Sequence, residues 1–332
     1  MAKLLYVVHR YAPYPGGSEM NTQRYAEASV ALGHDVTVFA QTHKGDYNGV
    51  KLTSNPNCLS EKWDMIIVHG DGPAQNIVHF GVVNGPVMYL LIKPFVNSTL
   101  DFGLARAKWI GCATSFDADF VERKGYGAKK HFIKYPIPIV EPNPAARLNL
   151  YEHYGLQIPP NRKIILSCGG FWSHKGFKEL ASVFSSTPLL HSSLILTGYD
   201  MVGYDKSLND ISHVQQILLQ DTQLVRDVMS LADYYIMNSS DEGYGLVLLE
   251  AMQYGLNWAS RPVGGAPDLA KRGFGKIFNT PDELSTLLRS VELGENGFGH
   301  ISDASKSSRI SYVRVNHDPL KVTREMLSVG VQ

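Results

Sequence analysis

The chain has 332 residues, of which 44% are hydrophobic and 19% charged, as is typical of a globular protein of about two domains. Lys plus Arg and Asp plus Glu each number 31, and this balance argues against nucleic acid as a partner. Cys58, Cys112 and Cys168 are too few and too widely spaced for a disulfide framework or a CxxC metal site. We interpret them as free thiols, which fits a reducing cytoplasm.

The amino terminus carries no pattern of a secretion signal. Met1 is followed almost at once by the short apolar run 4–8, which has no cleavage site after it. No apolar stretch reaches the about 20 residues that a bilayer-spanning helix needs. We therefore expect a soluble, cytoplasmic protein, for which peripheral membrane contact stays open.

Residues 1–140 alternate strand and helix patterns. A helix is predicted at 18–32, because Tyr25, Ala28 and Leu32 form an apolar stripe and Gly33 follows. Strand followed by helix and strand in succession implies right-handed crossovers and a parallel sheet. The predicted strands are 4–8, 36–40, 65–68, 87–91, 110–113 and 131–134.

Prolines cluster between residues 136 and 160, and we interpret 141–160 as a linker with a short helix near 149–154. Alternation resumes over 161–305, and a last helix is predicted at 319–327 in a tail, 306–332, expected to pack towards the first domain. The fold class is thus α/β, with two Rossmann-like parallel-sheet domains facing a central cleft. The second domain has predicted strands at 163–168, 193–197 and 234–237 and helices at 177–184, 224–231, 246–254 and 281–291.

The segment from Asn238 to Met252, NSSDEGYGLVLLEAM, follows a strand and opens a helix. Its glycines let backbone approach a ligand, and the helix start offers N–H groups to an anion. Glu242 lies in the loop and Glu250 within an apolar helix, where a carboxylate needs a partner such as a sugar hydroxyl. A surface loop with one exposed acid is the alternative interpretation of these two glutamates alone.

The whole segment resembles the Glu-x7-Glu motif of retaining GT-B glycosyltransferases, in particular glycosyltransferase family 4. That motif reads Pro-Ser-x-x-Glu-Gly-Phe-Gly-Leu-x-x-x-Glu-Ala-Met, so Asn238 replaces the proline and Tyr244 the phenylalanine. The resemblance extends over about residues 3–285. Further stretches that resemble the family in the same order are 13–19, 33–38, 169–176 and 263–268, with Asp268 in place of a glutamate.

The resemblance implies a role for each matching position. Lys175 would neutralise the diphosphate of the donor, Glu242 would contact the transferred sugar, and Glu250 would bind the ribose. The implied co-substrate is a UDP-, GDP- or ADP-type nucleotide sugar, with no cofactor and no metal. The other implied donor-binding residues are Gly16, Gly17, Thr197, Gly198, Tyr199, Leu219, Gln220, Gly243, Tyr244, Gly245 and Leu246.

Two positions depart from the family pattern. Gly170 stands where the family usually has an arginine, so one of two diphosphate cations is missing, and His174 and Arg261 are the candidate replacements. Ile92 stands where many relatives have a histidine, and the neighbouring Lys93 is either a site residue or a solvated lysine. On the acceptor side the sequence offers Lys93 and His69, each of which lies just after a predicted strand, and the alternative interpretation of His69 is a structural turn.

The segment Asp117-Ala118-Asp119 has the spacing of a DxD metal motif, but it follows Thr114 and is better explained as the start of a helix, where acids suit the dipole. The resemblance implies a retaining, metal-independent glycosyltransferase whose acceptor is a glycan, a lipid-linked compound or a small molecule. Two alternatives stay open. One is a non-catalytic protein of the same fold that binds nucleotide sugars or glycans, and the other is a different GT-B chemistry such as an epimerase or a phosphorylase.

Overall fold

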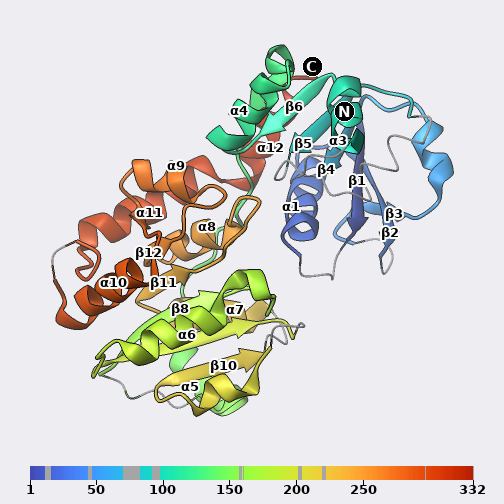
Figure 1. The fold of residues 1–332 in the computed structure, drawn as a ribbon. Coiled ribbons are helices and arrows are strands. Elements are labelled where there is room, and N and C mark those ends of the chain that lie inside the picture. Colours follow the sequence, from blue (N-terminus) through green and yellow to red (C-terminus); the bar gives the residue numbers. More distant parts are fainter. Residues whose placement is uncertain are drawn as a thin grey trace. The chain divides into compact units, whose positions relative to one another are not determined.

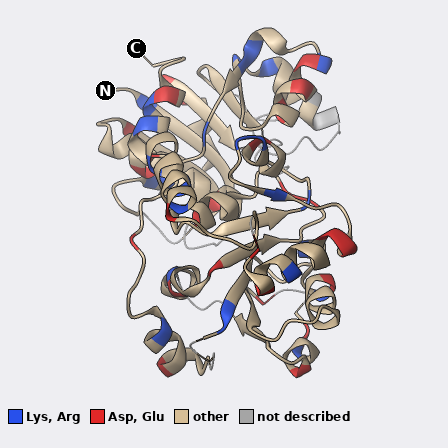
Figure 2. Ribbon diagram, turned by 90° about the vertical axis from the view of Figure 1, so that its left-hand side faces the viewer, with Lys and Arg blue, Asp and Glu red and all other residues tan. Residues whose placement is uncertain are grey.

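The structure is a computed structural model that describes residues 1–11, 16–43, 47–69, 83–91, 98–156, 159, 161–200, 204–218, 222–295 and 297–331. The chain divides into two compact units (Figure 1). Unit 1 comprises Met1–Pro138 and Val315–Gln332, and unit 2 comprises Ile139–Arg314. Lys and Arg are intermixed with Asp and Glu along the ribbon of each unit (Figure 2), as the balanced composition predicts.

Unit 1 is built on a seven-stranded sheet in which every pairing is parallel. The strand order is β3-β2-β1-β4-β5-β6-β7, so the winding direction reverses between β1 and β4. Ligands of such sheets bind at the carboxyl ends of the strands where the order reverses. The strands are β1 Lys3–Arg10, β2 Asp35–Thr42, β3 Lys51–Thr53, β4 Met65–His69, β5 Val87–Leu91, β6 Trp109–Cys112 and β7 Lys130–Phe132.

Helices cover this sheet through apolar side chains. Leu100, Leu104 and Phe120 join strand residues in one buried cluster, and α12 packs on α1. Thr114 and Asp117 form a reciprocal capping box, so the prediction that this segment starts a helix is confirmed. The helical elements of unit 1 are α1 Gly17–Ala31, η1 Pro56–Ser60, α3 Ser98–Arg106, α4 Ser115–Arg123, η2 Gly127–Lys129 and α12 Pro319–Leu327.

Unit 2 contains a six-stranded sheet, again parallel throughout. Its order is β10-β9-β8-β11-β12-β13, which reverses between β8 and β11. This reversal fixes where the 169–176 loop after β8 and the 238–245 loop after β11 emerge side by side. The strands are β8 Lys163–Cys168, β9 Ser192–Gly198, β10 Val214–Leu218, β11 Tyr234–Met237, β12 Asn257–Ser260 and β13 Gly275–Ile277.

One face of the unit 2 sheet is buried by α6 and α10, which pack together and contribute Phe177, Leu180, Phe184, Leu284 and Leu288 to a common core. Helix α11 contains the boundary between the units, at Arg314 and Val315. The helical elements are α5 Ala146–Tyr154, η3 Ser173–Lys175, α6 Phe177–Ser186, η4 Lys206–Asp210, α7 Thr222–Leu231, α8 Leu246–Gln253, α9 Ala266–Lys271, α10 Pro281–Leu293 and α11 Asp303–Asn316.

The proline-rich segment after Pro138 is held against the rest of unit 2 by polar side chains. Asp227 is 1% exposed, and its carboxylate accepts hydrogen bonds from Asn143 Nδ2 at 2.6 Å and Asn149 Nδ2 at 3.2 Å. Gln253 Oε1 accepts the backbone N–H of Val140 at 3.1 Å. Since these amides neutralise no charge, Asp227 depends on them to offset the cost of burying its carboxylate.

Within the described residues, no helix is long and apolar enough to cross a membrane. The same residues contain no group of three or more His, Cys, Asp or Glu side chains placed to hold a metal ion.

Candidate functional site

The carboxyl ends of β8 and β11 bring the two predicted charged residues together. Lys175 Nζ lies 2.7 Å from Glu242 Oε1, and their side chains are 16% and 12% exposed. Lys175 ends the short helix η3 in the 169–176 loop, and Glu242 lies in the 238–245 loop. A cation and a carboxylate thus stand at the strand-order reversal of unit 2, the place where parallel sheets bind ligands.

Asn238 ties the two loops to each other. Its Nδ2 donates to the carbonyl oxygen of Gly176 at 2.9 Å and to Glu179 Oε2 at 2.9 Å. The backbone N–H of Ser240 donates to the carbonyl oxygen of His174 at 2.8 Å. Proline, the residue expected at position 238 from the resemblance, could form none of the side-chain bonds, so this departure adds a direct link between the loops that carry Lys175 and Glu242.

Arg261, one candidate replacement for the cation missing at Gly170, is bound elsewhere. Its Nη2 lies 2.6 Å from Glu179 Oε2, and its Nε donates to Asn238 Oδ1 at 2.9 Å. These bonds lower the pKa of Glu179, although partial burial opposes them and is the larger single effect. The guanidinium therefore braces the loops through Asn238 and Glu179.

Helix α8 begins at an open amino terminus. Its N-cap residue is Gly245, which has a φ of +82° and, being glycine, no side chain to cap the first turn. A Cβ there would lie 3.0 Å from Met237 Cε and in a backbone conformation that other residues rarely adopt. The N–H groups of the first turn, beginning with Leu246, are thus not used by a side-chain cap, as an anion site at a helix start requires.

Glu250 lies on α8 and is half-buried. Burial raises the pKa of the Cys168 thiol to about 12, the negative charge of Glu250 raises it further, and Lys175 opposes the shift. Cys168 ends β8 and therefore lies within the electric field of Glu250 and Lys175. The three charged residues that the sequence predicts for the donor accordingly surround the ends of β8 and β11.

The predicted donor-binding residues Thr197, Gly198 and Tyr199 lie where β9 ends, close to the 169–176 loop. A Cβ on Gly198 would lie 1.5 Å from the carbonyl oxygen of Gly169, so only glycine fits there. The Phe171 N–H donates to the Tyr199 carbonyl oxygen at 3.0 Å. The hydroxyl of Thr197 donates to the Ile217 carbonyl oxygen at 3.0 Å, and the residue is fully buried. This side chain therefore links β9 to β10 within the sheet. Leu219 and Gln220 lie outside the described residues.

Tyr244 packs beneath the next loop, that of residues 263–268. Its carbonyl oxygen accepts the Gly265 N–H at 2.7 Å, and a Cβ on Gly265 would lie 2.8 Å from its ring. Burial raises the pKa of its phenol, and the nearby Tyr312 and Asp268 raise it further. The side chain of Tyr244 therefore packs against the 263–268 loop.

In unit 1 the predicted glycines open helix α1 at the end of β1. Gly16 is the N-cap residue and Gly17, which is exposed, the first helical residue. Glu19 is 3% exposed and lies 3.0 Å from Arg10 Nε. A Cβ on Gly16 would lie 2.1 Å from Glu19 Oε2, so any side chain at Gly16 would displace the buried carboxylate. The sequence shows Glu19 only as part of a motif and does not indicate this role.

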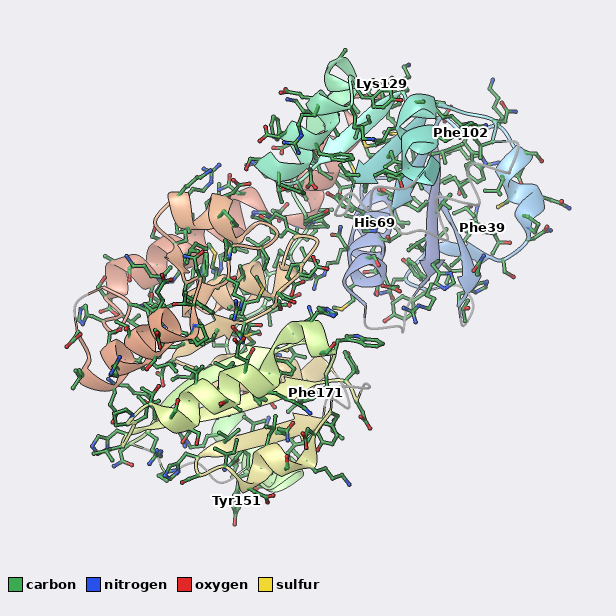
Figure 3. All side chains as sticks on the ribbon, viewed as in Figure 1. Phe39, His69, Phe102, Lys129, Tyr151 and Phe171 are labelled. Atoms are coloured by element: carbon green, nitrogen blue, oxygen red, sulfur yellow. The ribbon has the colours of Figure 1, made fainter. Side chains whose placement is uncertain are left out.

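His69 is a buried residue at the end of β4 (Figure 3), with 1% of its surface exposed. Its Nδ1 lies 2.5 Å from Thr22 Oγ1 and its Nε2 lies 3.3 Å from Asn21 Nδ2, both on α1. Burial lowers the pKa of the imidazole to about 4. Since both ring nitrogens bond within the fold, His69 holds α1 to the sheet. Ile92 and Lys93 lie outside the described residues.

Comparison with solved structures places both units in one fold class. The structure of Anabaena Alr3699/HepE in complex with UDP-glucose superposes with a TM-score of 0.81 and 15% identity, over 99% of this chain and 99% of that one. Two Rossmann-like parallel sheets whose order reverses as described above define the GT-B fold, which this chain therefore has.

Residues 152–306 match the family model described as glycosyl transferases group 1. The N-acetyl-alpha-D-glucosaminyl L-malate synthase of Bacillus anthracis is 25% identical over 277 residues, which are 78% of this chain and 66% of that protein. The sulfoquinovosyl transferase SQD2 of Arabidopsis thaliana is 30% identical over 148 residues, which are 41% of this chain and 28% of that protein. The chain thus spans less than two thirds of the length of these relatives.

Proposed function

We propose that the protein is a retaining glycosyltransferase that moves a sugar from a nucleotide-sugar donor to an acceptor without a metal ion. The observation that carries the proposal is the ion pair of Lys175 and Glu242 at the strand-order reversal of unit 2, with Glu250 and the open start of α8 beside it. The match of residues 152–306 to the group 1 family model and the GT-B fold support the same class of reaction.

The chemistry follows from where charge develops. When the bond between the anomeric carbon and the diphosphate breaks, negative charge grows on the departing phosphate. A fixed cation and the amino terminus of a helix stabilise that charge without reorganising. We assign these roles to Lys175 and to the first turn of α8 from Gly245. Glu242 would accept hydrogen bonds from the transferred sugar, and Glu250 from the ribose.

The acceptor is a glycan, a lipid-linked compound or a small molecule, and we assign it to unit 1. UDP-, GDP- and ADP-sugars are the candidate donors. UDP-glucose is the first to test, because Anabaena Alr3699/HepE, which shares the fold, holds it. A cytoplasmic location and peripheral contact with a membrane are part of the same proposal.

The test is turnover with a panel of nucleotide sugars, each with and without EDTA, followed by release of the nucleotide. We expect release with one class of donor, unchanged by EDTA, and a product whose anomeric configuration by NMR equals that of the donor. Activity that EDTA abolishes would contradict the metal-independent mechanism. An inverted product would contradict retention.

A non-catalytic protein that binds nucleotide sugars is the second candidate, and one observation favours it. Gly170 offers no cation, and Arg261 is bound to Glu179 and Asn238 rather than placed as a substitute. In that case calorimetry would show a nucleoside diphosphate bound tightly, while no donor in the panel would be turned over.

A further inference from the structure

Tyr235 on β11 makes a contact at the strand-order reversal that the sequence does not indicate. Its side chain is fully buried, and its hydroxyl donates to the Cys168 carbonyl oxygen at 3.0 Å. The hydroxyl oxygen of Tyr235 in turn accepts the Cys168 N–H at 3.2 Å. One phenol hydroxyl thus satisfies both backbone groups of the last residue of β8.

These two backbone groups are the ones that would form the next hydrogen bonds between β8 and β11. On its other edge β8 pairs with β9 up to Cys168, whereas its register with β11 ends at Leu166. The Ile164 carbonyl oxygen accepts from Asp233 on the β11 side, and alternate residues of a parallel strand bond to the same neighbour. Cys168 therefore faces β11, and the hydroxyl of Tyr235 takes the place of a β11 backbone group.

The consequence is an opening between the two strands at their carboxyl ends. Gly169 follows Cys168 directly, and a Cβ on Gly169 would lie 3.5 Å from Lys175 Cε, so the stem of Lys175 rests on this backbone. Burial raises the pKa of Tyr235 far above its ordinary value, and the charges of Glu242 and Glu250 add to the shift. The phenol thus lies beneath the charged residues of the site.

We propose that Tyr235 is a positioning residue for the diphosphate-binding site. Its hydroxyl ends the hydrogen bonding between β8 and β11, keeps these two strands apart at that point and fixes the position of the backbone against which Lys175 packs. The inference rests on the proposed function for its ligand, a nucleoside diphosphate. The structural role of the hydroxyl does not depend on the proposed function.

Tyr234 supplies a matched control on the same strand. Its hydroxyl is also buried and donates to a backbone carbonyl oxygen, that of Gly299, at 2.8 Å. Tyr234 and Tyr235 are consecutive residues of a strand, so their side chains point to opposite faces of the sheet. Tyr234→Phe and Tyr235→Phe therefore remove the same chemical group and a comparable hydrogen bond from opposite faces.

The experiment measures the affinity for UDP, GDP and ADP by calorimetry and backbone hydrogen exchange over residues 163–176, in the wild type and both variants. With the diphosphate that the wild type binds best, we expect Tyr235→Phe to weaken affinity about tenfold, because a displaced Lys175 loses about one charge-assisted hydrogen bond to the diphosphate. Exchange at Cys168 and Gly169 should become faster. Tyr234→Phe should lower the unfolding midpoint about as much as Tyr235→Phe does. It should leave the diphosphate affinity and the hydrogen exchange over residues 163–176 unchanged.

A Lys175→Met background tests whether the hydroxyl acts through the lysine. There Tyr235→Phe should add less than a twofold further loss of affinity, because the group that it positions is absent. Equal loss of affinity in Tyr234→Phe and Tyr235→Phe would overturn the inference, as would unchanged affinity and exchange in Tyr235→Phe. A wild type that binds no diphosphate would count against the proposed function, whereas the exchange readout would still decide the role of the hydroxyl.

Discussion

Glu242→Gln should separate nucleotide binding from turnover. The substitution keeps the size of the side chain and removes the charge that lies 2.7 Å from Lys175 Nζ. In the ligand-free protein the Glu242 carboxylate forms an ion pair with Lys175, so a donor diphosphate has to compete with this carboxylate for the lysine. We therefore expect Glu242→Gln to bind a nucleoside diphosphate more tightly while it turns over donor far more slowly, because the contact to the transferred sugar is weakened.

The expected magnitudes follow from the exposure of the pair. Removing one partner of a fully buried pair costs about 3–5 kcal/mol, whereas exposed pairs contribute about 0–1 kcal/mol. With side chains 16% and 12% exposed, the pair lies between these cases, and we expect a loss of about 2 kcal/mol in the free energy of unfolding. For a domain of this size that corresponds to a melting temperature lower by about 4–8 °C. Affinity for the diphosphate should rise about three- to tenfold, a fraction of a charge-assisted hydrogen bond.

Calorimetric titration with UDP, thermal unfolding and donor turnover are measured together for this variant. Glu292→Gln is the matched control. Its carboxylate accepts the His191 N–H at 2.6 Å and the Ser192 hydroxyl at 2.7 Å. These contacts lie where β9 begins, at the amino ends of the strands, whereas Glu242 lies at the carboxyl ends. The control should lose stability without any change in affinity or turnover. A weaker affinity in Glu242→Gln than in the wild type would refute the competition between the carboxylate and the diphosphate.

Four further variants test the folded framework. Burial lowers the pKa of His69 to about 4, below its unfolded value of about 6.5, so stability is complete above pH 6.5 and falls by up to about 3 kcal/mol as the pH drops towards 4. His69→Gln should reduce that fall, measured by urea midpoints at pH 7 and pH 4.5. Asp227→Ala leaves three side-chain amides without their carboxylate and should lower the free energy of unfolding by about 2–4 kcal/mol in denaturant titration. Gly198→Ala places a Cβ against the Gly169 backbone and should yield little folded protein, judged by circular dichroism. Gly17→Ala has open space around its Cβ and should fold at least as stably as the wild type, so a loss of turnover alone would assign Gly17 to substrate binding.

Strong local patterns are the part of the fold that the sequence predicts well. The apolar runs 87–91 and 163–168 match β5 and β8, and the tail helix matches α12, residue for residue. The predicted parallel sheets are confirmed, and the α/β class with them. Each of these segments is a mainly apolar run or an amphipathic helix with a clear start, so its local preference agrees with its place in the fold.

Several elements are absent from the sequence prediction because their local signal is weak. Strands β3 and β13 have three residues each, β12 has four, and β10 contains two glutamines. Helices α3, α9 and α11 were missed as well, and α9 has only six residues. Such segments take their conformation from the neighbouring strand or core that they complete, which a sequence window does not contain.

By itself the sequence determines the class of fold, the alternation of strand and helix, the loops that carry Lys175 and Glu242 and the helix that carries Glu250, because those depend on periodicity, glycines and spacing along the chain. Only the tertiary structure decides which residues meet. It bonds Asn238 to the 169–176 loop, commits Arg261 to Glu179, turns His69 into a packing residue and sets the hydroxyl of Tyr235 at the end of β8. These contacts join residues far apart in the chain, and their energies depend on burial and on distance in space, which no local pattern records.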